Sequence, residues 1–212
     1  MPARLTTIVF DLDGTLYASD SLAREIQLSA ARYVAELLGV TLEEAVKLLA
    51  ETRSRLAAET GTEVPLTRVC SELGGNPREL HLHFCRDIDP KQHLHLDDRV
   101  VKLLRALKER FSLYIYTNNN RDLAGRIVEI LGFSGLFQDM FSIEYSWRPK
   151  PDGRTLQDLF TVIGATPAES LFVGDRYDVD LRLPEEMGAR VKLVKTVDEL
   201  LTLKMLLDEE TL

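Results

Sequence analysis

Residues 6–15, Thr-Thr-Ile-Val-Phe-Asp-Leu-Asp-Gly-Thr, decide the fold class of this chain. The first five side chains are β-branched or aromatic, and an unbroken run of this kind is typical of a strand buried on both faces. Such strands occur in parallel sheets that helices cover on each side. Asp11 and Asp13 follow at the carboxyl end of the strand, where open parallel sheets carry their functional sites.

Residues 97–212 continue this pattern, because short apolar runs alternate with segments of helical periodicity. We predict strands at 111–117, 141–143, 171–173 and 190–194. Helices are predicted at 97–110, 121–131, 153–163 and 178–187, and from residue 198 onward. Strands that alternate with helices in this way indicate βαβ units. The sequence therefore predicts an α/β core, with a Rossmann-like parallel sheet and helices on both of its faces.

Residues 16–96 interrupt this core with helices alone. Their apolar side chains recur at helical spacing, and no strand pattern occurs among them. We predict helices at 19–39, 41–60, 66–73 and 77–87. The expected organisation is an α/β core of residues 1–15 and 97–212, with an all-helical domain of residues 16–96 inserted after the first strand.

The composition excludes several classes of partner. The 212 residues include 26 Lys and Arg against 34 Asp and Glu, which gives a net charge of −8 at pH 7. This balance argues against nucleic acid or an anionic membrane surface as the main partner. No apolar run is long enough for a membrane span, and Cys70 and Cys85 do not make a disulfide framework. We expect a cytoplasmic protein with reduced thiols.

Polar side chains follow four of the predicted strands, at the ends that meet along one edge of a parallel sheet. They are Asp11 and Asp13 after the first strand, Thr117, Asn118, Asn119 and Asn120 after the second, Lys150 after the third, and Asp175, Asp178 and Asp180 after the fourth. Carboxylates that crowd together repel each other unless a hard divalent cation neutralises them. A Mg²⁺ ion held by one or two carboxylates and a substrate phosphate fits this composition.

Each of these segments has an ordinary explanation when it is taken alone. Asp-x-Asp-Gly suits a surface turn, Thr-Asn-Asn-Asn a polar loop, and Lys-Pro the solvated start of a helix. The acidic segment after Gly174 can cap the positive end of the next helix. These explanations do not account for four such segments at successive strand ends, and we interpret them as one site.

Together the segments resemble the four sequence motifs of the haloacid dehalogenase superfamily, and the resemblance covers essentially the whole chain. The matching residues are Asp11-Leu-Asp-Gly-Thr-Leu16, Thr117, Lys150-Pro151, and Asp175 with Asp180 in Gly-Asp-x-x-x-x-Asp. The resemblance implies that the helical insertion is a cap domain. Leu16-Tyr17 and the helices of the insertion are most similar to the pyrimidine 5′-nucleotidase-type branch.

The resemblance also implies a role for each matching residue in phosphoryl transfer. Asp11 matches the nucleophile that forms an aspartyl-phosphate, and Asp13 matches the general acid and base. Thr117 and the backbone N–H of Asn118 match donors to the phosphate oxygens. Lys150 matches the cation that binds the phosphate and steadies the nucleophile.

For the metal, the resemblance implies Mg²⁺ ligands from Asp11, the Asp13 carbonyl and Asp175. Asp180 fits the last acid of the fourth motif, which would orient the lysine or act through water. Asp178 is closer in sequence and could take this place, so the sequence leaves the choice between the two acids open.

Asp13 separates two chemistries that the superfamily supports. Dehalogenases of the superfamily generally lack this second Asp and the metal, so the resemblance implies a Mg²⁺-dependent phosphatase. The expected substrate is a small phosphomonoester, such as a nucleoside monophosphate, phosphoglycolate or a sugar phosphate, because a helical insertion at this point would obstruct a folded protein. A phosphomutase and a non-catalytic phosphate-binding domain are the alternatives. We expect a monomer or a homodimer.

Four histidines form two pairs, His81 with His83 and His93 with His95. A second metal site is one interpretation, because Cys85 lies close by in the sequence. Against it, residues two apart do not share a helix face, and the usual zinc spacings are absent. We therefore expect solvated histidines near the connection between the two domains.

Overall fold

The computed structural model describes residues 3–208, which divide into two compact units. Within these described residues, the first unit comprises 3–18 and 94–208, and the second comprises Ser19–His93. The two points at which the chain passes between the units lie a few residues from those expected from the sequence. We call the first unit the core and the second the cap.

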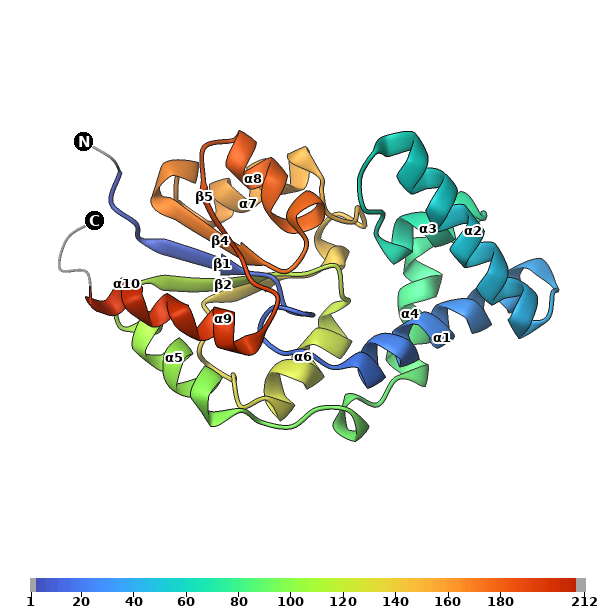
Figure 1. The fold of residues 1–212 in the computed structure, drawn as a ribbon, viewed down its shortest axis with the longest axis horizontal. Coiled ribbons are helices and arrows are strands. Elements are labelled where there is room, and N and C mark those ends of the chain that lie inside the picture. The colour runs from blue at the N-terminus through green and yellow to red at the C-terminus, as the bar shows by residue number, and fades with distance from the viewer. Residues whose placement is uncertain (1–2, 209–212) are drawn as a thin grey trace. The chain divides into compact units, whose positions relative to one another are not determined.

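The core is built on a five-stranded sheet in which every neighbouring pair of strands is parallel. The strands are β1 (Thr7–Phe10), β2 (Ser112–Tyr116), β3 (Asp139–Phe141), β4 (Ser170–Gly174) and β5 (Arg190–Leu193). Their order is β3-β2-β1-β4-β5, so the first strand of the chain lies at the centre (Figure 1). All four residues of β1 are buried, as the apolar run predicts. The α/β fold with a parallel sheet is confirmed.

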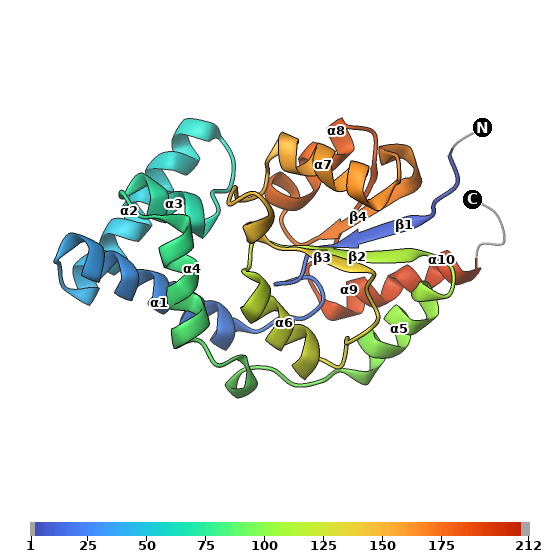
Figure 2. The same cartoon turned by 180° about the vertical axis from the view of Figure 1, so that it is seen from behind.

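Helices cover both faces of the sheet. The helices of the core are α5 (Asp98–Lys108), α6 (Arg121–Ile130), α7 (Gly153–Ile163), α8 (Arg182–Glu186), α9 (Val197–Leu201) and α10 (Met205–Asp208). Helices α7 and α8 lie on one face, and α5, α6 and α9 lie on the other (Figures 1 and 2). Helices make the crossovers between the strands, so all the strands run in the same direction. Their carboxyl ends therefore lie at one edge of the sheet.

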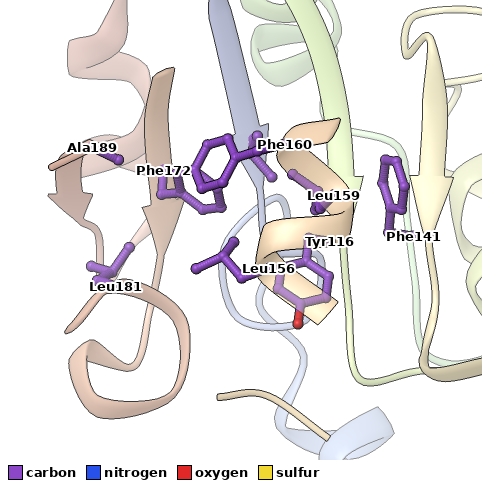
Figure 3. Close-up of a cluster of buried hydrophobic side chains, with 9 residues drawn as sticks. Tyr116, Phe141, Leu156, Leu159, Phe160, Phe172, Leu181 and Ala189 are labelled. Atoms are coloured by element: carbon purple, nitrogen blue, oxygen red, sulfur yellow. The ribbon is translucent and has the colours of Figure 1, made fainter. Parts of the chain in front are cut away.

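A cluster of buried apolar side chains joins α7 to the sheet (Figure 3). Its members come from β1, β2, β3, β4, α7 and the segment around α8, and they are Val9, Tyr116, Phe141, Leu156, Leu159, Phe160, Phe172, Leu181 and Ala189. The rings of Phe160 and Phe172 pack edge to face with centroids 5.7 Å apart. This packing fixes α7 to the strands whose ends carry the polar segments.

Two predicted elements differ from the structure. The strand predicted at 141–143 lies at Asp139–Phe141, because Ile143 already belongs to a 3₁₀ turn, Ile143–Tyr145. The helix predicted at 178–187 begins with a π-helical turn over Tyr177–Leu181 and becomes α-helical only at Arg182. Asp180 in that turn is buried against Gly174, where a Cβ atom would lie 2.5 Å from the Asp180 Cβ. The irregular turn therefore directs an acidic side chain inward, which a hydrophobic period does not predict.

The cap consists of four helices: α1 (Asp20–Leu38), α2 (Leu42–Thr60), α3 (Leu66–Glu72) and α4 (Pro77–Asp87). Helix α1 packs against both α2 and α4 and buries Leu22, Ala30 and Val34. Its N-terminus is capped by Ser19, whose Oγ accepts a hydrogen bond from the Leu22 N–H at 3.2 Å. The all-helical insertion is thus present as predicted.

Among the described residues, no helix is both long and apolar enough to cross a membrane.

Candidate active site

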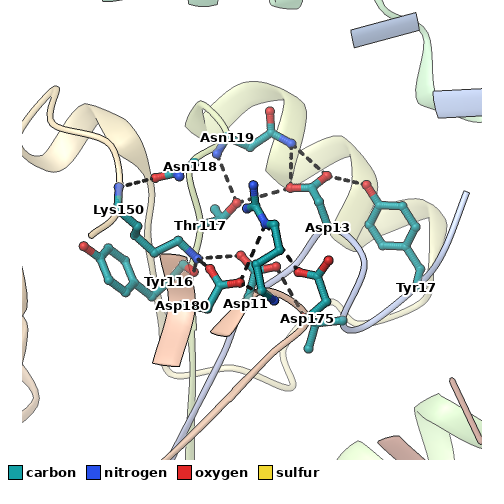
Figure 4. A network of polar contacts seen from close by, with 12 residues as sticks. Asp11, Asp13, Tyr17, Tyr116, Thr117, Asn118, Asn119, Lys150, Asp175 and Asp180 are labelled. Atoms are coloured by element: carbon teal, nitrogen blue, oxygen red, sulfur yellow. Dashed lines mark hydrogen bonds and ion pairs between the residues drawn. The ribbon is translucent and has the colours of Figure 1, made fainter. Parts of the chain in front are cut away.

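The polar segments that follow β1, β2 and β4 meet because these three strands are neighbours at the centre of the sheet. The Asp11 N–H donates to the Val173 carbonyl at 2.8 Å, and the Thr117 N–H donates to the Phe141 carbonyl at 2.9 Å. These bonds continue the strand pairing one residue beyond the strands themselves. The backbone that carries Asp11 and Thr117 is therefore held by the same bonds as the sheet. The side chains that these residues direct into the site are shown in Figure 4.

The Lys150 ammonium is the centre of the charged cluster. It is 2 % exposed and donates hydrogen bonds to Asp11 Oδ1 at 2.6 Å, Asp180 Oδ1 at 2.7 Å and the Tyr116 carbonyl at 2.8 Å. Burial opposes its charge, but the carboxylates of Asp11 and Asp180 outweigh this effect and raise the lysine pKa. All three N–H bonds of the ammonium end on protein oxygens, so Lys150 holds these groups in place and only its charge remains to act on a bound anion.

Asp11, the predicted nucleophile, is buried beside this lysine. Burial raises its pKa to about 7, although the Lys150 charge lowers it, and the neighbouring carboxylates of Asp180 and Asp13 add to the rise. Lys150 occupies its Oδ1, whereas its Oδ2 has only a 3.4 Å contact from the Thr15 hydroxyl. Oδ2 is thus the less occupied of the two oxygens.

Asp13, the predicted general acid, is held by three side chains. The Asn119 amide donates to both of its carboxylate oxygens, at 3.1 and 3.0 Å, and the Thr117 hydroxyl donates to Oδ2 at 3.3 Å. The Tyr17 hydroxyl donates to Oδ1. Neither Asn119 nor Tyr17 has a role that the sequence alone predicts. The signal for Asn119 was its place in the polar run after β2, but that run does not show which asparagine points at Asp13.

Thr117 and Asn118, the predicted phosphate donors, both lie at the end of β2. The Thr117 hydroxyl accepts from the Asn119 N–H at 3.0 Å and gives its own hydrogen to Asp13. The Asn118 Oδ1 accepts from the Lys150 backbone N–H at 2.7 Å, which fixes the orientation of its amide. Its Nδ2 is buried and has no hydrogen-bond partner within residues 3–208, so this N–H₂ group is an unsatisfied donor beside the site.

The structure separates the two acids between which the sequence could not choose. Asp180 lies in the cluster, where it binds Lys150 and accepts the Arg176 backbone N–H at 3.1 Å on Oδ2. Burial raises its pKa, but Lys150 and Arg176 outweigh this and keep it low. Asp178 is partly exposed and pairs instead with Arg182 at 3.5 Å. Of the two, Asp180 alone contacts the lysine.

Arg176 also lies in this cluster. Its Nε is 3.7 Å from Asp175 Oδ1 and 3.9 Å from Asp180 Oδ2. Its side chain is 32 % exposed, so it sits at the margin between the carboxylates and solvent. Burial opposes its charge, but the surrounding carboxylates outweigh this and raise its pKa. No pattern in the sequence places this arginine inward, because it follows Asp175 in an irregular turn.

Three carboxylates form a group that fits a divalent cation. Asp11, Asp175 and Asp180 each offer an oxygen, and these atoms lie within 4.8 Å of one another. Asp175 Oδ1 is buried and accepts no hydrogen bond from the described part of the chain, and burial raises the Asp175 pKa. Carboxylate oxygens suit hard cations such as Mg²⁺. Of the predicted ligands, Asp11 and Asp175 belong to this group, and Asp180 is an additional carboxylate. The Asp13 carboxylate is not part of it and is bonded instead to Thr117, Asn119 and Tyr17, so its carbonyl stays a predicted ligand.

Gly14 leaves room for this group. Its φ is +87°, and a Cβ built on it would lie 2.6 Å from Asp175 Oδ2. The turn after β1 thus needs glycine for its left-handed backbone and for the close approach of a carboxylate.

The expectation that the histidines are solvated is wrong for the cap histidine His81. His81 is 2 % exposed rather than solvated, and its Nε2 lies 3.2 Å from the Thr67 hydroxyl. His83 packs against the Tyr33 ring and contacts Arg86 through Nδ1 at 2.9 Å. Within the described residues, the histidines belong to no group of three potential metal ligands; the one such group is the aspartate cluster of the core.

Comparison with known proteins gives matches over most of the chain. The family model described as haloacid dehalogenase-like hydrolase matches residues 5–188. The pyrophosphatase PpaX of Listeria monocytogenes serotype 4a is 26% identical over 181 residues, which cover 84% of this chain and 77% of the relative. The phosphoglycolate phosphatase of Aquifex aeolicus is 25% identical over 205 residues, which cover 89% of this chain and 84% of the relative.

Solved structures share the fold at lower identity. A HAD phosphatase from Thermococcus onnurineus superposes with a TM-score of 0.61 and 16% identity, covering 98% of this chain and 100% of that one. The L-2-haloacid dehalogenase from Xanthobacter autotrophicus has a TM-score of 0.54 and 20% identity, covering 97% and 84%. The same architecture thus occurs in a phosphatase and in a dehalogenase, and the reaction must be argued from the site.

Proposed function

Because the chain belongs to the haloacid dehalogenase-like hydrolases, we propose that it is a Mg²⁺-dependent phosphatase for small phosphorylated molecules. The observation that carries this proposal is the second carboxylate, Asp13, which lies beside the buried Asp11–Lys150 pair. Hydrolysis of a phosphate ester needs a group that protonates the leaving oxygen. Asp13 supplies that group, and loss of a halide ion would not need it.

Asp11 is the proposed nucleophile. Its Oδ2 attacks phosphorus while Lys150 holds Oδ1, so an Oδ2–P bond forms and the bond from phosphorus to the leaving oxygen breaks. Asp13 gives its proton to that oxygen, which leaves as an alcohol. Asp13 then takes a proton from water, which attacks phosphorus and breaks the Oδ2–P bond. The products are inorganic phosphate and the original carboxylate.

The remaining residues of the site would bind the metal ion or the phosphate. Asp11, Asp175, Asp180 and the Asp13 carbonyl are the groups that would hold Mg²⁺, which when bound neutralises the carboxylates and the phosphoryl oxygens. The Asn118 amide supplies a buried donor for a phosphate oxygen. Thr117 can supply a second donor when its hydrogen leaves Asp13. Lys150 stabilises the charge that develops on the phosphoryl group without leaving Asp11.

The named relatives support phosphate chemistry and narrow the first substrates to test. One is a phosphoglycolate phosphatase and several are pyrophosphatases, so phosphoglycolate and pyrophosphate join nucleoside monophosphates and sugar phosphates as candidates. The charge cluster recognises the phosphoryl group that these compounds share.

A phosphate-release screen over these compounds, with and without Mg²⁺, tests the proposal. We expect Mg²⁺-dependent release by the wild type and a loss of at least about 10³-fold in Asp11→Asn, since an amide is not a competent nucleophile. Asp158→Asn, which makes the same change on the exposed side of α7, is the matched control and retains activity. Release that persists in Asp11→Asn contradicts the aspartyl-phosphate route. Transfer of phosphate to a second sugar without release favours a phosphomutase, and binding without turnover favours a non-catalytic domain.

A further inference from the structure

The site contains a clamp on Asp13, formed by the side chains of Tyr17 and Asn119, with a longer contact of 3.3 Å from the Thr117 hydroxyl. We propose that these two are positioning residues, which orient the Asp13 carboxyl group toward the leaving oxygen. The inference rests on the proposed function, in which Asp13 is the general acid. It concerns a separate question, namely what keeps that acid in its reactive orientation.

The contacts of the clamp reach both oxygens of Asp13. The Asn119 Nδ2 lies 3.1 Å from Oδ1 and 3.0 Å from Oδ2, so one amide group spans the whole carboxylate. Tyr17 binds Oδ1 from the other side (Figure 4). A carboxylate held at a single oxygen can still rotate about its Cβ–Cγ bond. Contacts at both oxygens remove that rotation and define the plane of the group.

The clamp residues are themselves fixed by the core. Asn119 is 6 % exposed; its N–H donates to Thr117 Oγ1 at 3.0 Å and its carbonyl accepts from the Ile143 N–H at 3.0 Å. Tyr17 is 8 % exposed, and its carbonyl accepts from the Gly14 N–H at 3.0 Å. One residue comes from the β2 end and the other from the turn after β1. Asp13 is thus tied across two neighbouring strand ends.

The two groups that contact Asp13 differ in whether they can accept a hydrogen bond as well as donate one. An amide N–H₂ group only donates, so Asn119 pairs with the ionised carboxylate. A phenol hydroxyl both donates and accepts, so Tyr17 can remain bonded to Oδ1 whether or not Asp13 carries a proton. Asp13 changes protonation twice in each proposed cycle. A clamp with one fixed and one adaptable partner keeps the carboxyl group oriented through both changes.

Leaving-group dependence is the readout that separates positioning from simple structural support. A p-nitrophenolate ion leaves without a proton, whereas an alkoxide needs one. Loss of the acid's orientation therefore lowers kcat/KM for alkyl phosphates and spares it for p-nitrophenyl phosphate. The ratio kcat/KM reports the steps up to formation of the aspartyl-phosphate, so it excludes the later hydrolysis, in which Asp13 acts as the base on the same intermediate for both substrates. Damage to the nucleophile, the metal site or the fold slows both substrates equally.

The experiment measures kcat and KM of Tyr17→Phe and Asn119→Ala on p-nitrophenyl phosphate and on the alkyl phosphomonoester that the wild type hydrolyses fastest. We expect kcat/KM on the alkyl ester to fall about 10- to 100-fold, in line with the cost of misplacing a catalytic group, and on p-nitrophenyl phosphate less than about 3-fold. Tyr114→Phe, which removes the hydroxyl of a β2 tyrosine whose ring lies beside Phe141, is the matched control for Tyr17→Phe.

Asp13→Asn serves as the reference for full loss of the acid. If it shows the leaving-group dependence and the clamp variants do not, the inference is overturned while the proposed function stands. Equal losses on both substrates in the clamp variants also overturn it. If Asp13→Asn lowers kcat/KM on both substrates alike, Asp13 is not the acid and the inference falls with that assignment. Should Asn119→Ala fail to fold, Tyr17→Phe, which removes one oxygen atom, decides the question alone.

Discussion

Replacement of Gly14 by alanine should weaken metal binding in addition to a modest loss of folding stability. The new Cβ would lie 2.6 Å from Asp175 Oδ2 and 2.8 Å from its Cγ, closer than the 3.0 Å below which real Cβ contacts essentially never occur. The carboxylate must therefore move by about 0.4 Å or more, which exceeds the tolerance of about 0.2 Å in metal–ligand distances. Since Asp175 is the end of a flexible side chain, this movement costs little folding free energy.

The backbone adds a second, separable effect. Gly14 has φ +87°, and a left-handed residue with a side chain costs about 1–2 kcal/mol. Gly188 has φ +95°, and no atom lies within 4 Å of the position that a Cβ would take there, so Gly188→Ala carries the backbone strain without the contact. We expect both variants to lose about 1–2 kcal/mol of unfolding free energy in metal-free buffer.

The two variants should differ only when metal is added. Thermal unfolding midpoints measured across a MgCl₂ titration give the apparent affinity, because a cation that binds the folded form raises the midpoint with its concentration. We expect the Mg²⁺ dependence of Gly188→Ala to match the wild type. That of Gly14→Ala should shift to about 10- to 100-fold higher Mg²⁺, comparable to the loss of a supporting contact at a metal site. Identical titrations for the two variants would refute the reasoning, since Asp175 would then bind no metal or would adjust without consequence.

Three further results are expected. Burial lowers the His81 pKa to about 4 from an unfolded value of 6.5, so the folded state binds fewer protons than the unfolded state. Up to about 3 kcal/mol of stability, present above pH 6.5, is therefore lost as the pH falls from 6.5 to 4. Unfolding titrations of His81→Gln should lack this loss, whereas the exposed-site control His95→Gln should retain it. Lys150→Met leaves buried carboxylates without their cation and should lower the unfolding free energy by about 3–5 kcal/mol in urea titrations, and a smaller loss than about 1 kcal/mol would contradict the pairing. Asp180→Asn should lower kcat at least about 10-fold because it releases Lys150, while Asp178→Asn should stay within about 2-fold; the reverse order would exchange the two acids.

The central strand and the position of the site follow from local features of the sequence. The apolar run before Asp11 has the burial that its composition predicts, and the rule that strand ends carry function places Asp11, Thr117 and Asp175 together. Both inferences depend on short-range patterns. Strand period, helix period and turn chemistry are encoded within a few residues of where they act, so a single sequence contains them.

The contacts that the sequence did not predict depend on distant segments. The bond from Asn119 to Asp13 joins residues 106 positions apart, and nothing near Asn119 distinguishes it from Asn118. The choice of Asp180 over Asp178 depends on a π-helical turn, which has no clear hydrophobic period. In each case tertiary packing decides which of two nearby side chains makes the contact, and the local sequence preference does not.

The central place of β1 has a consequence for how the chain folds. β1 is the first strand to be synthesised, yet both of its partners come later, β2 at Ser112–Tyr116 and β4 at Ser170–Gly174. Loop closure over such separations is slow, whereas the cap is continuous in sequence and can complete its own helix contacts early. During synthesis the apolar residues 7–10 therefore lack one of their two neighbouring strands until Ser170–Gly174 has emerged. Asp11 follows directly on β1 and Asp175 directly on β4, so the carboxylate group of the site can form only after that late pairing.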